Sequence, residues 1–239
     1  GDNNTAIGYK ALTDNNTGYT NTAVGGRALE SNITGYKNTA VGFGAMADGT
    51  GGSENTAVGF EALHKHNNVF STAVGFQALL NSTGGANTAI GRHSMGGQTT
   101  GTMNTAVGSW ALYSNEDGSY NTAVGYQSMQ GSVGKSMYNT AMGYKSLYTI
   151  TTGRENVAVG NEAGGTLRTG WYNVFIGNKA YPSANNSWNQ IVIGHDTDGL
   201  GDNKAVIGNT NVTDVYMAQD MGAMVHADGV KFYEDTANG

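Results

Sequence analysis

The nine residues from Asn121 to Met129 read NTAVGYQSM, and variants of their first five letters recur through most of the chain. Twelve copies end in a glycine, at Gly8, Gly25, Gly42, Gly59, Gly75, Gly91, Gly108, Gly125, Gly143, Gly160, Gly177 and Gly194. Successive glycines are 16 to 18 residues apart, most often 17, and a weaker thirteenth copy ends at Gly208 after a gap of 14. A short fixed period of this kind is typical of repeat architectures, in which each unit contacts mainly its neighbours.

Each repeat predicts extended structure broken by turns. The string Thr-Ala-Val is too short for a helix, and its β-branched residues favour a strand. The glycine that follows allows a bend, and a Thr-Gly pair ahead of the next asparagine supplies a second turn. Two short strands and two turns make one coil of a solenoid, whereas helical repeats need roughly 33–47 residues. We therefore expect an all-β parallel β-solenoid of about thirteen coils over residues 1–208.

Stacking converts the repeated residues into ladders, because equivalent residues of successive coils lie about 4.8 Å apart. The asparagine of each motif would hydrogen-bond to the coils above and below. Threonine and valine lie two residues apart and share a face of the strand. We expect that face to be internal, with the valines as a continuous apolar spine. The ladder residues singled out are Asn38, Asn55, Asn104 and Asn121, and Val41, Val58, Val107 and Val124.

A single column of such coils has little core. Only 38% of the residues are hydrophobic, against roughly 45–50% in ordinary domains. The small alanine face of the first strand, and the alanines that follow the motif, would suit close approach of another chain. These second alanines are Ala11, Ala28, Ala45, Ala62, Ala78 and Ala111. We therefore expect an obligate homo-oligomer.

The repeat resembles known fibre proteins over about residues 3–208. Asn-Thr-Ala-Val-Gly is similar to the Ser-x-Ala-x-Gly motif in the heads of trimeric autotransporter adhesins, and Asn156–Gly160, NVAVG, differs from it only in Asn for Ser. The longer string Asn121–Met129 is similar to repeats of bacteriophage tail fibres. The resemblance implies a left-handed β-roll type of solenoid, assembled as a homotrimeric fibre, on a virion or a cell surface and therefore extracellular.

The pattern changes after Gly208, so residues 209–239 form a separate C-terminal segment. Val212–Met217 and Val230–Tyr233 alternate as strands do. Two compatible interpretations stay open for this segment. It caps the end of the solenoid, or it is a trimeric neck that leads to a chaperone domain of the kind found in phage fibres.

Composition excludes several classes of function. The chain of 239 residues has no cysteine, so disulfides, thiol catalysis and cysteine zinc sites are absent. Its net charge of −6 argues against nucleic acid as a partner. No run of 18 apolar residues is present, which predicts no membrane insertion.

No catalytic constellation emerges from the sequence, and we expect neither an enzyme nor a cofactor. Asp196, Asp198 and Asp202 have the acidic spacing of a calcium loop, but the bidentate glutamate of such loops is missing. They are a weak candidate metal site, and an ordinary turn rich in aspartate is the favoured interpretation. His64 and His66 share a face of an extended segment without further ligands, which favours an exposed turn over a metal site.

Aromatic residues give a better indication of binding. Tyr9, Phe43, Phe60, Phe76, Tyr126 and Tyr144 recur after the motif glycine, as a packing ladder would. Four others, Trp110, Trp171, Tyr172 and Trp188, fall where the repeat does not demand an aromatic ring. Flat rings with polar edges suit sugar stacking. These four are candidate glycan-binding residues, with local packing as the alternative.

The expected function is a structural and adhesive fibre: the shaft or tip of a phage tail fibre that attaches to a host surface glycan or protein by multivalent binding. The alternatives are a bacterial trimeric surface adhesin, an ice-binding solenoid and a polysaccharide-degrading tailspike. The regular threonine ladder favours ice binding, but a threonine on the same face as an internal valine would itself be internal.

Overall fold

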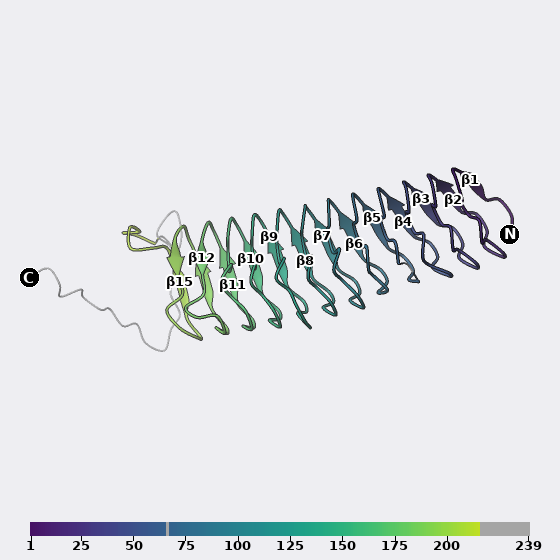
Figure 1. Cartoon of the computed structure of the whole chain (residues 1–239). Helices are drawn as coiled ribbons and strands as arrows, with labels where there is room; N and C mark the ends of the chain where they lie inside the picture. The colour runs from purple at the N-terminus through teal and green to yellow at the C-terminus, as the bar shows by residue number, and fades with distance from the viewer. Residues whose placement is uncertain (66, 216–239) are drawn as a thin grey trace, which may run out of the picture. The chain divides into compact units, whose positions relative to one another are not determined.

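The computed structural model describes residues 1–65 and 67–215. The chain divides into two units, Gly1–Asn209 and Thr210–Gly239, and the first unit contains all the strands of the described residues. Figure 1 shows this first unit as a stack of narrow coils that follow one another in chain order from β1 to β15. No helix of the described residues is long and apolar enough to cross a membrane.

The strands are very short, two or three residues each. They are β1 (Thr5–Ile7), β2 (Thr22–Val24), β3 (Thr39–Val41), β4 (Thr56–Val58), β5 (Thr72–Val74), β6 (Thr88–Ile90), β7 (Thr105–Val107), β8 (Thr122–Val124), β9 (Thr140–Met142), β10 (Val157–Val159), β11 (Val174–Ile176), β12 (Ala180–Tyr181), β13 (Ile191–Ile193), β14 (Thr197–Asp198) and β15 (Ala205–Ile207).

Thirteen of these strands form one parallel sheet in the order β1 to β11, β13, β15. Each strand pairs in register with the same motif one repeat away, as in Ala106 opposite Ala123. The predicted parallel β-solenoid with coils of about 17 residues is therefore confirmed. Only β12 and β14 form a second sheet, through Ala180 opposite Thr197.

The second strand expected in every coil is wrong for most of the chain, where a turn takes its place. Gln127 and Met129 have φ angles of 56° and 51°, in the left-handed region, and the equivalent residues of other coils do the same. These turns still bond from coil to coil, since the Met129 N–H donates to the carbonyl of Ser146 at 2.9 Å. Backbone groups are thus satisfied between coils without the regular alternation of a strand.

The core lies on the opposite face of the strand from the one expected. Ala106 and Ala123 are fully buried, whereas Val107 and Val124 are only half-buried and Val41 and Val58 are 36% and 38% exposed. The expectation that Val41, Val58, Val107 and Val124 form an internal spine is therefore wrong. Threonine shares the outward face with valine, as the alternation of a strand requires.

The alanines expected to face another chain belong to the core of this one. Ala28, Ala45, Ala62, Ala78 and Ala111 are fully buried, and they pack with the strand alanines and with a row of leucine and methionine side chains. The row consists of Leu29, Met46, Leu63, Leu79, Met95, Leu112, Met129 and Leu147. Small strand residues leave room for these long side chains, which the left-handed turns point inward.

The asparagine ladder is buried beside the core. The Asn121 backbone N–H and side-chain amide both donate to Oδ1 of Asn104, at 2.9 and 3.1 Å, and the amide also donates to the carbonyl of Ser136 at 2.9 Å. Asn38 and Asn55 are bonded in the same way: the backbone N–H of Asn55 donates to Oδ1 of Asn38 at 3.1 Å. The amides stabilise each coil against its neighbours.

Glycine directly after each strand of the large sheet permits the close stacking of coils. Gly125 has a φ of 130°, and a Cβ atom there would lie 2.5 Å from the carbonyl oxygen of Gly143 in the next coil. No side chain fits at that distance, so the recurrence of glycine has a steric cause.

The core changes composition near the C-terminal end of the solenoid. Phe175 takes the place of the strand alanine, and Gly164 takes the place of the leucine. A Cβ atom on Gly164 would lie 2.8 Å from the Phe175 ring. The small and large residues have exchanged places, and the core stays filled.

After residue 208, Val212–Val215 form no strand. The rest of the segment Val212–Met217, and the whole of Val230–Tyr233, lie outside the described residues.

Candidate functional site

Two parallel rows of side chains run along one edge of the solenoid near its C-terminal coils. The first row holds Arg154, Trp171 and Trp188, each two residues before the buried ladder position. Parallel backbone bridges join Arg154 to Trp171 and Trp171 to Trp188, so the three residues lie in register on successive coils. The second row, two residues earlier in each coil, holds Thr152, Thr169 and Asn186.

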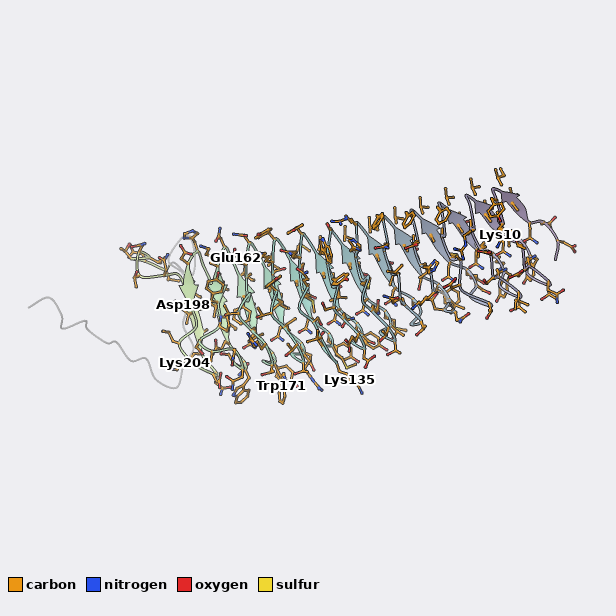
Figure 2. The ribbon with its side chains drawn as sticks, viewed as in Figure 1. Lys10, Lys135, Glu162, Trp171, Asp198 and Lys204 are labelled. Carbon is orange, nitrogen blue, oxygen red and sulfur yellow. The ribbon has the colours of Figure 1, made fainter. Side chains whose placement is uncertain are left out.

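The two rows enclose an open groove of about 610 Å³, with Tyr172 as a further lining residue. Trp171 and Trp188 are 48% and 46% exposed. Figure 2 shows Trp171 projecting from the edge of the solenoid opposite the one that carries Glu162. Two large aromatic faces with polar groups beside them are thus available to a ligand.

The groove contains a single charged lining residue, Arg154. Its guanidinium carbon lies 5.8 Å from the centre of the Trp171 ring, within the range of a cation–π contact. No carboxylate within residues 1–65 and 67–215 forms an ion pair with it. The guanidinium keeps hydrogen-bond donors for a ligand.

Three of the four candidate glycan-binding residues, Trp171, Tyr172 and Trp188, are brought together at this groove. Trp110 is elsewhere: it is half-buried, with ring centres of His93 and Tyr113 both 4.5 Å away and the Arg92 guanidinium at 5.6 Å. Burial, with a smaller contribution from Arg92, lowers the pKa of His93. Trp110 therefore packs against its neighbours, as the alternative interpretation expects.

Sequence reasoning missed Arg154 and the polar row, although a signal for Arg154 exists. Residues 154, 171 and 188 are separated by 17 residues, one coil each. Extending the period back from the two tryptophans therefore places Arg154 beside them.

The aromatic residues after the motif glycine stack along the column. The ring centres of Phe43 and Phe60 are 5.6 Å apart and those of Phe60 and Phe76 are 5.2 Å apart, with nearly parallel planes. All three rings are more than one third exposed. They form a packed stripe on the surface.

The acidic residues do not form a metal centre. Asp202 accepts hydrogen bonds from the Trp188 backbone N–H at 3.0 Å and from the Gln190 side chain. Asp198 lies in β14 opposite Tyr181 of β12, and the carboxylate of Asp196 lies 3.5 Å from His195. The described residues contain no cluster of three or more histidine, aspartate or glutamate side chains placed to hold a metal. His64 bonds to Asp48 and Gly44, and His66 lies outside the described residues.

A second, smaller hollow of about 210 Å³ contains Lys145, Glu162 and Tyr181. The Tyr181 hydroxyl donates to Oε2 of Glu162 at 2.8 Å. Burial and this hydrogen bond raise the pKa of Tyr181 to about 12. Glu162 is the only carboxylate that lines the hollow, and the usual glycoside hydrolysis uses two.

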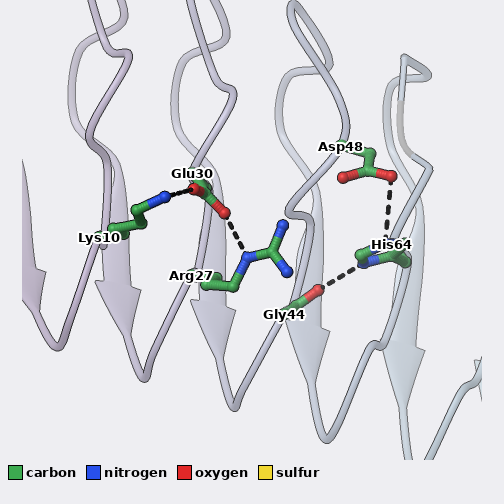
Figure 3. A network of polar contacts seen from close by, with 6 residues as sticks. All are labelled: Lys10, Arg27, Glu30, Gly44, Asp48 and His64. Carbon is green, nitrogen blue, oxygen red and sulfur yellow. Dashed lines mark hydrogen bonds and ion pairs between the residues drawn. The ribbon is translucent and has the colours of Figure 1, made fainter.

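Several charges of the N-terminal coils form ion pairs on the surface. In Figure 3, Glu30 lies between Lys10 and Arg27, with Lys10 Nζ 3.1 Å from its Oε1. The hydrogen bond from Arg27 and that from Lys10 lower the pKa of Glu30. His64 Nε2 and Asp48 Oδ2 are 3.2 Å apart in the same view. The Lys10–Glu30 and Asp48–His64 pairs link neighbouring coils.

Comparison with known proteins does not identify the chain: no protein-family model, no curated protein and no solved structure matches it.

Proposed function

We propose that this chain is a non-enzymatic adhesive fibre segment that binds surface glycans through the groove of Trp171 and Trp188. The observation that carries this proposal is the placement of the two exposed indoles on adjacent coils, with a row of hydroxyl and amide side chains beside them. Sugar rings stack on such faces, and neutral polar groups bond to their hydroxyls.

The solenoid serves as the rigid support for this site. Parallel hydrogen-bonded coils and a buried amide ladder keep the two indoles in register. In the proposed fibre, the chain forms a homotrimer of left-handed β-rolls on a virion or cell surface. A phage tail fibre is the first candidate and a bacterial surface adhesin the second.

The outward face of the large sheet is the surface that the proposed trimer covers. Its strands contain no charged residue, and Val41, Val58, Ile90, Met142 and Ile176 are all more than one third exposed on it. Three copies would also present three grooves, and multivalent attachment raises avidity without a new contact.

Binding of the purified chain to immobilised surface oligosaccharides tests the proposal. Trp171→Ala and Trp188→Ala should each weaken binding by about ten- to a hundredfold, given roughly 1–3 kcal/mol per ring stack. Trp110→Phe is the matched control and should bind normally. A chain that binds no oligosaccharide, or that binds as well without either groove tryptophan, would contradict the proposal. Shortening of the oligosaccharide would instead support the tailspike alternative.

Light scattering tests the trimer. A mass of three chains would support the proposed homotrimer, and a stable monomer would contradict it. A monomer would also leave the Thr-x-Val face free in solution.

Ice binding is a second candidate because the threonines face outward. Thr5, Thr22, Thr39, Thr56, Thr72, Thr88, Thr105, Thr122 and Thr140 lie on nine successive strands, at a regular spacing and without charges between them. Threonine was expected to be internal because it shares a face with valine. Since the buried residue of the strand is alanine, threonine and valine both point outward. Thermal hysteresis measured on the intact protein, compared with Thr105→Lys, decides it: no ice shaping would exclude this function.

A further inference from the structure

The groove of Trp171 and Trp188 is asymmetric in charge along its length. In the first row, Arg154 precedes the two tryptophans, and Asp202 occupies the equivalent position in the coil that follows Trp188. A cation therefore lies at one end of the row and a carboxylate at the other.

The carboxylate end is already occupied by the protein's own groups. Asp202 Oδ1 accepts the Trp188 backbone N–H at 3.0 Å and lies 3.4 Å from Nε2 of Gln190. Its charge is thus turned toward the backbone, where it fixes the position of Trp188 in the row.

The cation end is available to a ligand. Arg154 is exposed and contacts the face of Trp171 without an ion pair to any carboxylate of the described residues. Lys135 lies in the preceding coil, two residues before Met137, as Thr152 lies two residues before Arg154. Figure 2 shows Lys135 and Trp171 projecting from the same edge.

The chemistry of this end differs from the rest of the chain, whose net charge is −6. An acidic chain repels anionic sugars in general, so a cationic pair on the same edge as the two exposed indoles selects for them locally. Guanidinium binds a carboxylate through two parallel hydrogen bonds, which fixes orientation as well as charge. Neutral sugars offer this group only hydroxyl acceptors, without an opposite charge.

We propose that the groove binds an acidic glycan, with the carboxylate of a uronic or sialic acid unit on Arg154 and the following sugar rings on Trp171 and Trp188. This inference rests on the proposed function of the same groove. Lys135 attracts the anion at the entry of the groove, and Thr152, Thr169 and Asn186 bond to sugar hydroxyls.

The test uses two pairs of probes. Oligogalacturonate and its methyl ester differ in charge and one methyl group per unit, and a sialylated oligosaccharide is compared with its asialo form, which lacks the whole acidic sugar. Binding to the full chain is followed by tryptophan fluorescence at low and high salt. We expect the acidic member of at least one pair to bind about tenfold or more tightly than its neutral form, since a charged hydrogen bond contributes roughly 1.5–3 kcal/mol. This preference should weaken with salt.

Arg154→Gln keeps a hydrogen-bonding side chain and removes the charge, so it should abolish the preference for the acidic probe and leave the neutral one unchanged. Lys10→Gln, at the far end of the solenoid in Figure 2, is the matched control for a lost cation. Equal binding of acidic and neutral probes, unaffected by Arg154→Gln but lost in Trp171→Ala, would overturn the acidic preference and keep the glycan groove. No binding of any probe would overturn both.

Discussion

The coils from β1 to β9 and those from β10 to β15 solve the same packing problem in different ways. In the first region the strand supplies alanine to the core and the left-handed turn supplies leucine or methionine. In the second region Phe175 and Val192 fill the core from the strand, and Gly164 leaves room in the turn. A fixed backbone thus accepts a core whose large side chains come from either side.

The two regions also differ on the surface. The outward strand position is threonine in β1 to β9 and valine, isoleucine or alanine in β10, β11, β13 and β15. The groove and the second sheet of β12 and β14 both belong to the C-terminal region. The coils from β1 to β9 therefore extend the solenoid with a uniform surface, and those from β10 to β15 contain the candidate binding groove.

In both regions the middle residue of each strand of the large sheet points to the core and its neighbours point outward. The largest expected effect comes from a charge placed on each face of one strand. Ala123→Asp places an unpaired carboxylate in the core, and we expect loss of the folded state because such burial costs several kcal/mol. Val124→Asp places the charge on the outward face, so the chain should keep its β-sheet circular dichroism while its self-association weakens. The opposite result, with only Val124→Asp unfolded, would show that the valines point to the core.

Exchanging the core residues of the second region for those of the first sharpens the comparison. Phe175→Ala should lower the free energy of unfolding by about 3–5 kcal/mol through a cavity. Gly164→Leu alone should overpack against the Phe175 ring at a cost of about 1–3 kcal/mol. The double variant should recover part of the loss in urea unfolding, and simple additivity would show that the two sites do not share one space.

The amide ladder runs through both regions, and its interruption should affect stability more than an equal change on the surface. Asn104→Ala leaves the buried N–H of Asn121 without its acceptor, at about 1–3 kcal/mol. It also removes one of the two amide donors to the Gly118 carbonyl, which keeps the bond from Asn115. Thermal unfolding measures the loss, with the exposed Asn189→Ala as control. Equal melting temperatures for the two variants would mean that the ladder does not hold the coils together.

The smallest expected effect is the pH dependence that Tyr181 gives to the stability of the second region. Tyr181 has its pKa raised from 10.0 to about 12 in the folded chain, chiefly by burial. The unfolded chain loses this proton first, so the contribution of Tyr181 is present below about pH 10 and is lost as the pH rises toward 12. Urea unfolding of Tyr181→Phe should show a weaker alkaline loss than the unchanged protein, with Tyr172→Phe as control; identical profiles would contradict this.

Most of the fold could be predicted from the period of the motif, because a recurrence of about 17 residues places equivalent residues side by side on successive coils. Threonine and valine alone do not show which face of the strand is buried, because both residues form strands well whether they point to the core or to the solvent. Asn121 held the missing clue: it lies two residues before Ala123 and shares its face, so a buried amide ladder implies a buried alanine. The candidate site was predicted in part. Trp171 and Trp188 are noticeable because the motif does not require an aromatic residue there, whereas Arg154 is informative only once it is placed one coil before Trp171.

The most direct measurement of the stacked coils is a set of distances between spin labels, since the chain has no cysteine of its own. Labelled cysteine pairs at Thr22 and Thr105, and at Thr22 and Thr140, lie five and seven strands apart in the large sheet. At about 4.8 Å per coil, pulsed electron paramagnetic resonance on chains diluted with unlabelled protein should give roughly 24 and 34 Å. Two distances that do not increase in this proportion would contradict the stacking of one coil on the next.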